Sequence, residues 1–323
     1  MKKFVILLLI LANGHCLMSQ QLGQFNQYMH NPYMLNPAAA GLDGNQMFLG
    51  YRKQWMGFGD GPLSFYFSGE YDIGKKPQKS YMPHSLRISN PKIYEKFQPQ
   101  KRSKFKHTLA GNIINDVNGF VSKTSGDITY AFSFPFSDNT KNLSIGFSTG
   151  FINLVFDQSK VTVLEPDNDI AYNDFLNYNA STIFLDMNFG VWLTTEKYFV
   201  GYSSMQLLGD NFSMGGNPSN FQMFMHHFLQ VGYNYEFNEN LVLVPAAIVR
   251  YVKDVPISYD VNFTAYYQDK YWGGLSYRYN AAAVVILGMK YKDLKFGYSF
   301  DYSTTGIQNY NSGSHEFLLG YIF

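Results

Sequence analysis

Apolar and polar residues alternate along most of the chain, from about residue 45 to its end. Between Ile257 and Tyr267, every odd position is apolar or aromatic, and the even positions from Ser258 to Thr264 are Ser, Asp, Asn and Thr. The stretch 294–303 alternates in the same way. A period of two gives a segment one apolar and one polar face, which is typical of half-buried β-strands.

Fourteen segments follow this pattern, and most of them are roughly 9 to 15 residues long. Strands of soluble sandwiches average about 5–6 residues, whereas strands that cross a bilayer at a tilt need about 9–11. We therefore predict an all-β fold, a transmembrane antiparallel β-barrel of about 14 strands, formed by residues 45–323. The expected strands are 45–56, 62–72, 105–114, 127–136, 142–156, 182–195, 197–207, 224–237, 241–252, 256–268, 270–280, 282–291, 294–304 and 315–323.

The connections between these segments indicate how the barrel is oriented. Those expected at one end are short, as at 195–197 and 292–293, and those at the other end include the longer 157–181 and 209–223. Outer-membrane barrels have short periplasmic turns and longer surface loops. The long segment 73–104 is the exception to this rule, because it falls on the periplasmic side.

The polar faces of neighbouring strands agree with each other. A turn centred on Asp269 would place Val261 opposite Tyr277, both on the apolar face. The same turn would place Asp260 opposite Arg278 on the polar face. Antiparallel neighbours must keep their apolar faces on the same side, so a register that sorts both faces is informative. We predict that Asp260 and Arg278 form a cross-strand pair in the lumen.

Residues 1–19 have the pattern of a secretory signal peptide. Two lysines precede the apolar stretch Phe4–Ala12, which is too short for a membrane-spanning helix of about 20 residues. We expect cleavage near Ser19–Gln20 and export to the outer membrane. Lipidation of Cys16 is the alternative, although His15 stands where lipoprotein signals have a small residue.

Residues 20–44 precede the first expected strand and do not alternate. Pro32, Pro37 and Gly41 interrupt regular structure in this segment. The segment could line the lumen, or it could lie beneath the barrel against a periplasmic partner. The sequence leaves both positions open.

The first expected strand carries charge on both faces. Parity places Arg52 and Gln54 in the lumen, where polar side chains of the next strand would surround the guanidinium. Lys53 and Trp55 point outwards, and an ammonium and an indole are both stable at the level of the lipid headgroups. We expect a structural pair for Arg52 inside the barrel, with direct contact to a partner protein as the alternative.

Four stretches resemble the PorP/SprF family of outer-membrane proteins: QFNQYMHNPYMLNPAAAG, YRKQWMGFGDGPLSF, GNIINDVNG and the C-terminal HEFLLGYIF. The resemblance implies a non-enzymatic barrel of the type IX secretion and gliding motility machinery of Bacteroidota. It implies contacts with type IX secretion components and with a secreted adhesin, whose export or anchoring at the cell surface the barrel would assist. The residues that carry it most specifically are Asn36, Pro37, Ala38, Gly41, Arg52, Gln54 and Trp55.

Positive charge is concentrated in the connection 73–104, which is longer than the resemblance leads us to expect. The overall net charge is +1, yet ten Lys or Arg and one acid lie between Ile73 and Lys106. A patch this local favours docking of an acidic periplasmic protein over binding of polyanions such as nucleic acid, and a solvated loop is the alternative. The candidate docking residues are Lys75, Lys76, Lys79, Arg87, Lys92 and Lys96.

Three motifs that resemble catalytic or metal sites have simpler explanations, so we expect no enzyme and no cofactor. The stretch 146–150 fits G-x-S-x-G, but alternation continues through it, whereas a nucleophile elbow needs a strand-to-helix turn. His226 and His227 are adjacent on a strand and would point to opposite faces. A weak calcium candidate lies in an acidic stretch that lacks EF-hand spacing, with a solvated loop as the alternative. Its residues are Asp167, Asp169 and Asp174.

Two functions remain open on the sequence. The first is the type IX accessory barrel that the resemblance implies. The second is an outer-membrane porin or a channel for small molecules or lipids, because fourteen strands leave room for a lumen with charged walls. The two functions differ in whether that lumen is open.

Overall fold

The computed structural model describes residues 24–73, 105–136, 141–161, 181–209, 212–214 and 223–323. The expected signal peptide, the candidate docking residues between Lys75 and Lys96, and the calcium candidates Asp167, Asp169 and Asp174 lie outside the described residues. In the described part, the helices are short 3-10 turns, and none has the length and apolar character needed to cross a membrane.

The described residues form sixteen β-strands, and each paired strand runs antiparallel to its neighbour. The strands are β1 (Gln46–Lys53), β2 (Leu63–Asp72), β3 (Lys106–Asn118), β4 (Val121–Phe136), β5 (Lys141–Phe156), β6 (Ser181–Thr195), β7 (Tyr198–Met205), β8 (Ser213–Met214), β9 (His226–Tyr233), β10 (Tyr235–Asn238), β11 (Leu241–Val252), β12 (Ser258–Tyr267), β13 (Tyr271–Arg278), β14 (Ala282–Tyr291), β15 (Leu294–Ser303) and β16 (Ser314–Ile322). The 3-10 turns are η1 (Gln27–Met29), η2 (Pro32–Met34), η3 (Pro37–Ala39), η4 (Gln158–Lys160) and η5 (Gly306–Tyr310).

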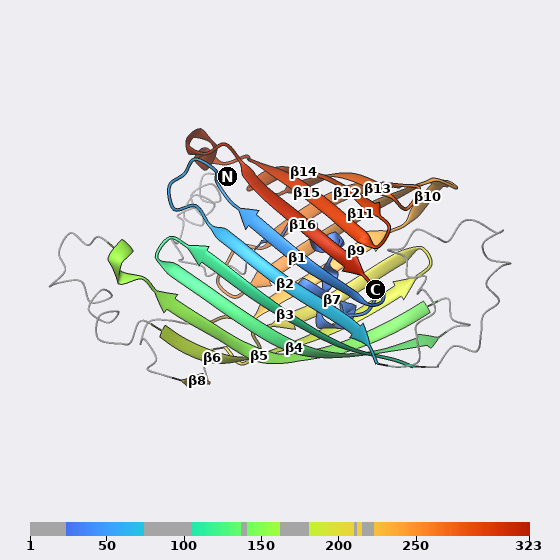
Figure 1. Cartoon of the computed structure of the whole chain (residues 1–323), viewed down its shortest axis with the longest axis horizontal. Coiled ribbons are helices and arrows are strands. Elements are labelled where there is room, and N and C mark those ends of the chain that lie inside the picture. The colour runs from blue at the N-terminus through green and yellow to red at the C-terminus, as the bar shows by residue number, and fades with distance from the viewer. Residues whose placement is uncertain (1–23, 74–104, 137–140, 162–180, 210–211, 215–222) are drawn as a thin grey trace, which may run out of the picture.

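The sheet closes on itself, because β1 pairs with β16 as well as with β2 (Figure 1). β9 and β10 are two parts of one barrel strand, interrupted at Asn234, and both pair with β11. β8 pairs with β6 outside this ring. The structure is therefore a closed barrel of fourteen antiparallel strands, which confirms the predicted fold class.

The sequence pattern underestimated the length of two strands. β3 and β4 were expected over 105–114 and 127–136, but their hydrogen-bonded ladder continues to the pair Asn118 and Val121. The residues of this extension are mostly polar or small, so the apolar face disappears while the backbone pairing persists. Alternation of hydrophobicity reports only the part of a strand that has one apolar face.

The two ends of the barrel differ in their connections. One end, here called the turn end, has the short turns 196–197, 239–240, 268–270 and 292–293, together with the long connection from β2 to β3. The opposite end, here called the loop end, has the longest of the other connections, including the one from β15 to β16. By the rule of short periplasmic turns, the turn end faces the periplasm and the loop end the cell surface.

The outer and inner faces of the barrel have opposite character. Large apolar side chains such as Leu49, Ile128 and Leu275 are exposed on the outer face, with exposed fractions of 54%, 70% and 64%. Buried polar side chains such as Ser68, Thr129 and Asn262 point inwards. An apolar exterior around a polar interior is the arrangement that a bilayer requires of a barrel.

Glycines on the luminal face make room for aromatic rings of the paired strand. A Cβ placed on Gly50 would lie 1.9 Å from the Tyr66 ring, so the ring lies directly over the glycine backbone. The same arrangement recurs in five cross-strand pairs and narrows the lumen with packed rings. They are Gly50–Tyr66, Gly201–Trp192, Gly232–Phe199, Gly288–Trp272 and Gly320–Phe48.

Replacing Gly50 by Leu should destabilise the barrel, because the new side chain would overlap the Tyr66 ring. Overpacking of this kind costs about 1–3 kcal/mol. In unheated SDS gels, the folded species of Gly50→Leu should be lost at a lower temperature than that of wild type. The matched control is Gly59→Leu, because nothing lies within 4 Å of a Cβ at Gly59. Equal thermal resistance of the two variants would contradict the packing of rings on luminal glycines.

Candidate functional site

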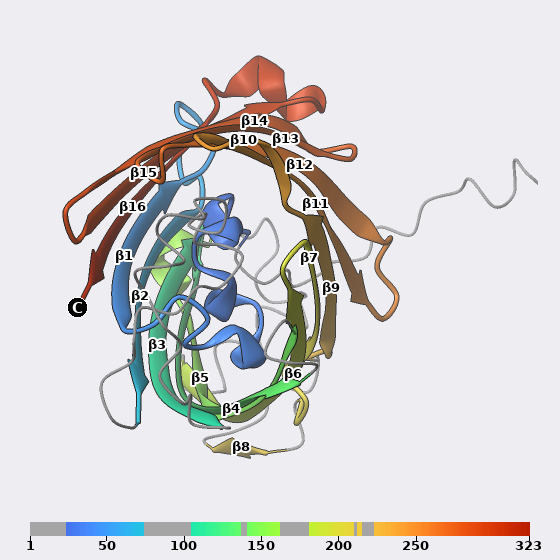
Figure 2. The same ribbon diagram turned by 90° about the vertical axis from the view of Figure 1, so that its right-hand side faces the viewer.

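The segment that precedes β1 lies inside the barrel. Figure 2 shows residues 24–44, here called the luminal segment, within the ring of strands. Every residue from Phe25 to Leu42 is buried. The segment winds through η1, η2 and η3, and Pro32 and Pro37 stand at the starts of the last two turns, where their fixed φ is compatible with a helical turn. Of the two positions that the sequence left open, the structure shows the luminal one.

Asn36, Pro37 and Ala38 are fitted against β5, β6 and β7. The Asn36 side chain caps η3 by accepting from the Ala38 backbone N–H at 2.9 Å. Its amide also donates to the backbone carbonyls of Val191 and Tyr202, at 3.3 and 3.1 Å. These contacts join the luminal segment to two neighbouring strands through one side chain.

Glycines of the wall allow this close approach. A Cβ on Gly146 would lie 2.4 Å from the backbone nitrogen of Ala38, and one on Gly190 would lie 2.0 Å from the Asn36 amide oxygen. Gly146 and Gly190 are paired in the register of β5 and β6. The G-x-S-x-G stretch that begins at Gly146 is therefore part of a continuous strand. Its first glycine allows the backbone of the luminal segment to pack against β5.

Arg52 forms a buried ion cluster with two carboxylates from the C-terminal strands. Its guanidinium lies 2.6 Å from Asp301 of β15 and 3.2 Å from Glu316 of β16. All three side chains are at most 3% exposed. These three residues are here called the Arg52 cluster. With its amide oxygen turned towards the guanidinium, Gln54 accepts from Arg52 Nε at 3.0 Å. Arg52 points inwards as parity indicated, but its carboxylate partners come from β15 and β16 rather than from β2.

The luminal segment binds directly to the Arg52 cluster. Glu316 accepts from the backbone N–H groups of Asn26 and Gln27, at 2.8 and 3.3 Å. The Asn26 side chain donates to Asp301 and, at 2.9 Å, to Ser299. Hydrogen bonds to ionised groups are stronger than those between neutral groups. The same carboxylates therefore neutralise Arg52 and hold the start of the segment.

A second ion cluster lies on the neighbouring wall. Asp260 accepts two hydrogen bonds from Arg250, at 2.7 and 2.9 Å, and lies 3.2 Å from Arg278. Asp260 and Arg278 are direct partners in the register of β12 and β13. These residues are here called the Asp260 cluster.

Asn26 joins the two clusters across the luminal segment. Its amide oxygen accepts from Arg278 at 3.3 Å, while its amide nitrogen donates to Asp301. Gln24 adds a second contact to Arg278, at 2.8 Å. Together the clusters contain three arginines and three carboxylates, so their charges balance. A chain of polar contacts thus runs from β11 through the segment to β1.

A separate set of contacts anchors the segment at the turn end. Glu70 accepts from the Gly41 backbone N–H at 2.5 Å, and Lys106 donates to the Gly41 carbonyl. Lys106 also lies 2.9 Å from Asp72. Gly41 has φ of +77°, and a Cβ there would meet Thr108 at 2.4 Å, so only glycine fits this bend.

Between its two ends, the segment makes further hydrogen bonds to the wall. The Tyr33 hydroxyl lies 2.8 Å from Thr129, and Asn31 donates to Ser68 at 2.8 Å. Ser203 donates to the Leu35 carbonyl at 2.5 Å. These contacts reach β2, β4 and β7, so the segment is bound to walls on several sides.

The remaining residues singled out in the sequence lie away from this site. Trp55 stands at the loop end with φ of +49°, and its ring meets Phe58 edge-on. His226 is buried whereas His227 contacts Tyr202 on the outer face, so the two imidazoles diverge. Within the described ranges, no group of three or more His, Cys, Asp or Glu side chains could hold a metal ion.

Sequence reasoning missed the acidic partners of this site. In the sequence, alternation places Asp301 and Glu316 on the luminal face of the last two strands, and Glu70 on the luminal face of β2. It does not indicate which residues they contact. The signal that could have found them is that each carboxylate occupies an inward position on a strand whose other inward residues are mostly uncharged. Nothing in the sequence indicated that Asn26 would connect them.

A closed barrel with an apolar exterior and its own N-terminal segment bound in the lumen defines a plugged outer-membrane β-barrel. The chain belongs to the family of type IX secretion system membrane proteins PorP/SprF, whose family model matches residues 17–321. The match includes the whole luminal segment. Fold and family together indicate the outer membrane as its location.

Solved structures with a similar fold are outer-membrane barrels of very different sequence. The toluene transporter TbuX of Ralstonia pickettii is 10% identical, with a TM-score of 0.46 over 91% of this chain and 92% of that one. A deltaS2 mutant of the monoaromatic hydrocarbon channel TodX is 11% identical, with a TM-score of 0.48 over 90% and 92%. The translocator domain of the autotransporter NalP of Neisseria meningitidis is 10% identical, with a TM-score of 0.40 over 86% and 87%. No curated protein matches the sequence.

Replacing Arg52 by Met should lower the free energy of unfolding by about 3–5 kcal/mol, because two buried carboxylates lose their cation. Unfolding by urea in detergent micelles, followed by tryptophan fluorescence, measures this change. Lys270→Met is the control, since it removes an exposed charge from a short turn and should change stability by less than about 0.5 kcal/mol.

The neutral triple variant Arg52→Met, Asp301→Asn and Glu316→Gln should be more stable than Arg52→Met alone, because no unpaired charge remains. A single variant as stable as wild type would contradict the role of the Arg52 cluster.

Proposed function

We propose that this protein assists the type IX secretion, or the cell-surface anchoring, of an adhesin-type cargo through protein–protein contacts and without enzymatic activity. Membership of the PorP/SprF family implies interaction with components of the secretion system. The single observation that supports a contact role over transport is the occupied lumen. The chain places its own residues 24–44 where a solute would pass.

The strength of these anchors argues against the porin alternative. A diffusion channel needs an open bore, and opening this one would break contacts at both ends of the luminal segment. The contacts of Asn26 and Gly41 involve charged groups, and such hydrogen bonds contribute about 1.5–3 kcal/mol each. Releasing the segment would also leave Glu316 and Asp301 without several of their donors. We infer that the segment stays in place while the protein functions.

The two ends of the barrel then serve different partners. The loop end faces the cell surface, where an adhesin would be received or retained. The turn end faces the periplasm, and the basic connection from β2 to β3 leaves the barrel there, beside Asp72 and Lys106. We propose that this connection docks an acidic protein of the periplasmic machinery, and that residues 1–19 are removed on export.

Fixing the luminal segment to the wall should leave secretion intact. Ala40 of the segment and Ala110 of β3 belong to one buried cluster, so the variant Ala40→Cys with Ala110→Cys is chosen to crosslink the two with little change in volume. The sequence contains a single other cysteine, Cys16, in the expected signal peptide. We expect normal adhesin display on cells carrying the oxidised variant, and no single-channel conductance from the purified protein.

The two single-cysteine variants serve as controls for this experiment, and intact-mass analysis confirms the crosslink. Loss of adhesin display that is restored by reductant would show that the lumen has to open. That result would favour the channel alternative.

Neutralising the basic connection should weaken contacts with the periplasmic machinery. The variant carries six Lys or Arg to Gln changes, at Lys75, Lys76, Lys79, Arg87, Lys92 and Lys96. We expect a folded barrel, a salt-sensitive loss of co-purified periplasmic partners of about ten-fold, and reduced adhesin display, because many weak charge contacts act together.

The matched control for this variant replaces exposed lysines on the short turns of the same end, Lys197, Lys270 and Lys292. It should retain partner recovery and adhesin display. Unchanged recovery of periplasmic partners by the variant with six substitutions would show that the connection is only a solvated loop.

A further inference from the structure

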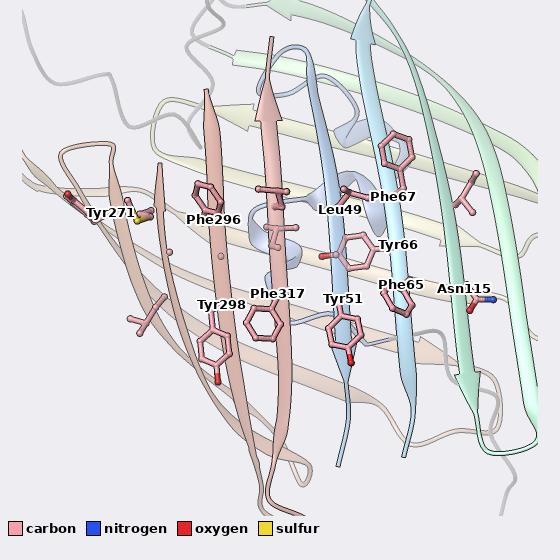
Figure 3. A pocket seen from close by; sticks show the side chains of 18 residues that line it. Leu49, Tyr51, Phe65, Tyr66, Phe67, Asn115, Tyr271, Phe296, Tyr298 and Phe317 are labelled. Carbon is pink, nitrogen blue, oxygen red and sulfur yellow. The ribbon is translucent and has the colours of Figure 1, made fainter. Parts of the chain in front are cut away.

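The apolar outer face of the barrel contains a groove. It lies where β13 to β16 meet β1 to β3 and has a volume of about 990 Å³. Figure 3 shows the side chains that line it; most of the labelled ones project outwards from neighbouring strands, whereas the Tyr66 ring lies over Gly50 on the luminal side of the wall. None of these strands contributes its outward face to the luminal site described above.

The register arranges the groove in horizontal rows. One row joins Phe296, Leu319, Leu49 and Phe67 through successive cross-strand pairs, and it is entirely apolar. The next row towards the loop end contains Tyr298 and Tyr51 on either side of Phe317. In Figure 3 the hydroxyls of both tyrosines point away from the apolar row, towards the loop end. The groove therefore changes from apolar to polar along the membrane normal.

A cationic edge completes this gradient. One row further towards the loop end, Lys53 and His315 are direct partners in the register of β1 and β16. His315 uses Nδ1 for a 2.8 Å contact with the Tyr298 hydroxyl. Lys53 donates to the Gly61 carbonyl at 2.6 Å, which leaves two of its three N–H donors for another acceptor. In the described part of the chain, no carboxylate lies within ion-pair distance of Lys53.

We propose that this groove binds a phosphorylated glycolipid of the outer leaflet. An acyl chain would run from the cationic edge towards the membrane mid-plane and cross the apolar row, against Leu49 and Phe67. The phosphate would accept from Lys53, with Tyr51 and His315 beside it. The cationic edge lies at the loop end, which the short-turn rule assigns to the cell surface, so the phosphate would stand at the level of the outer-leaflet headgroups. A membrane protein seated in the groove would bury the apolar rows equally well but would give no role to the unpaired Lys53.

Binding can be measured on the purified full-length barrel by native mass spectrometry in neutral detergent. The probes are a lipid A preparation, the same lipid after removal of its phosphates, and phosphatidylethanolamine. The variants are Lys53→Gln for the phosphate, Phe67→Ala for the acyl chain, and Lys253→Gln as a control. Lys253 is exposed at the loop end on β11–β12, away from the groove. Heat-modifiable gel mobility confirms that each variant is folded.

We expect Lys53→Gln to bind lipid A about ten-fold more weakly than wild type, since a charge-assisted hydrogen bond is lost. Lys253→Gln should bind as wild type does, and Phe67→Ala should weaken both lipid A and its dephosphorylated form. The dephosphorylated lipid should not distinguish Lys53→Gln from wild type. Equal binding of lipid A by wild type and Lys53→Gln would overturn the proposal, as would tighter binding of phosphatidylethanolamine than of lipid A.

Tryptophan emission gives a second measurement. Trp192 and Trp272 are buried in the lumen, whereas Trp55 is half-buried in the connection from β1 to β2, two residues beyond Lys53, so its emission reports on the loop-end edge of the groove. Lipid A should change the emission of wild type but not of Trp55→Phe. An unchanged emission of wild type at saturating lipid A would place the lipid elsewhere and overturn the assignment.

Discussion

In the part of the chain that the structure describes, the buried charge of Arg52 is neutralised by two carboxylates from the opposite end of the sequence. A guanidinium in the wall of a barrel cannot be left unpaired, and both of its carboxylates, Asp301 and Glu316, belong to the last two strands. They reach Arg52 because β1 pairs with β16. The same carboxylates bind Asn26 and Gln27 of the luminal segment. Charge balance, closure of the ring and the position of the segment therefore depend on one another.

The luminal wall is complementary in shape and hydrogen bonding to the luminal segment. Several of its glycines accept a ring from the neighbouring strand, and Gly146 and Gly190 accept Ala38 and Asn36 of the luminal segment. Its polar side chains meet matching donors and acceptors on the segment, such as Ser68 with Asn31. A wall of small and polar residues looks the same in sequence whether it borders a channel or a bound chain. The difference lies in the partner, which here is supplied by the same polypeptide.

Faces of strands were predictable from the sequence, whereas long-range partners were not. Alternation of apolar and polar residues assigns Arg52 and Asp260 to the lumen. Pairing the two strands on either side of the turn at Asp269 aligns Asp260 with Arg278. The partners of Arg52 lie 249 and 264 positions away, and no local pattern relates them. The luminal segment was also ambiguous, because a chain that meets wall on several sides has no single apolar face to reveal its position. The break at Asn234 interrupts a strand that reads as continuous, because an irregularity in pairing changes no hydropathy period.

The direction of the luminal segment constrains the order in which this protein assembles. Gln24 contacts Arg278 near the loop end, and Gly41 contacts Glu70 near the turn end, where β1 begins. The segment thus descends through the lumen and the chain reverses into the wall. In a ring that had already closed, a free N-terminus would have to travel along almost the whole bore, past rings packed on glycine, to reach this position. This passage is avoided if the strands assemble around a segment that already lies beside β1. One final pairing, that of β1 with β16, then closes the barrel around the segment. The pairing of β1 with β16 would then close the barrel and enclose the luminal segment in one step. The rate of membrane insertion would therefore depend on docking of the luminal segment, although that segment does not contact lipid.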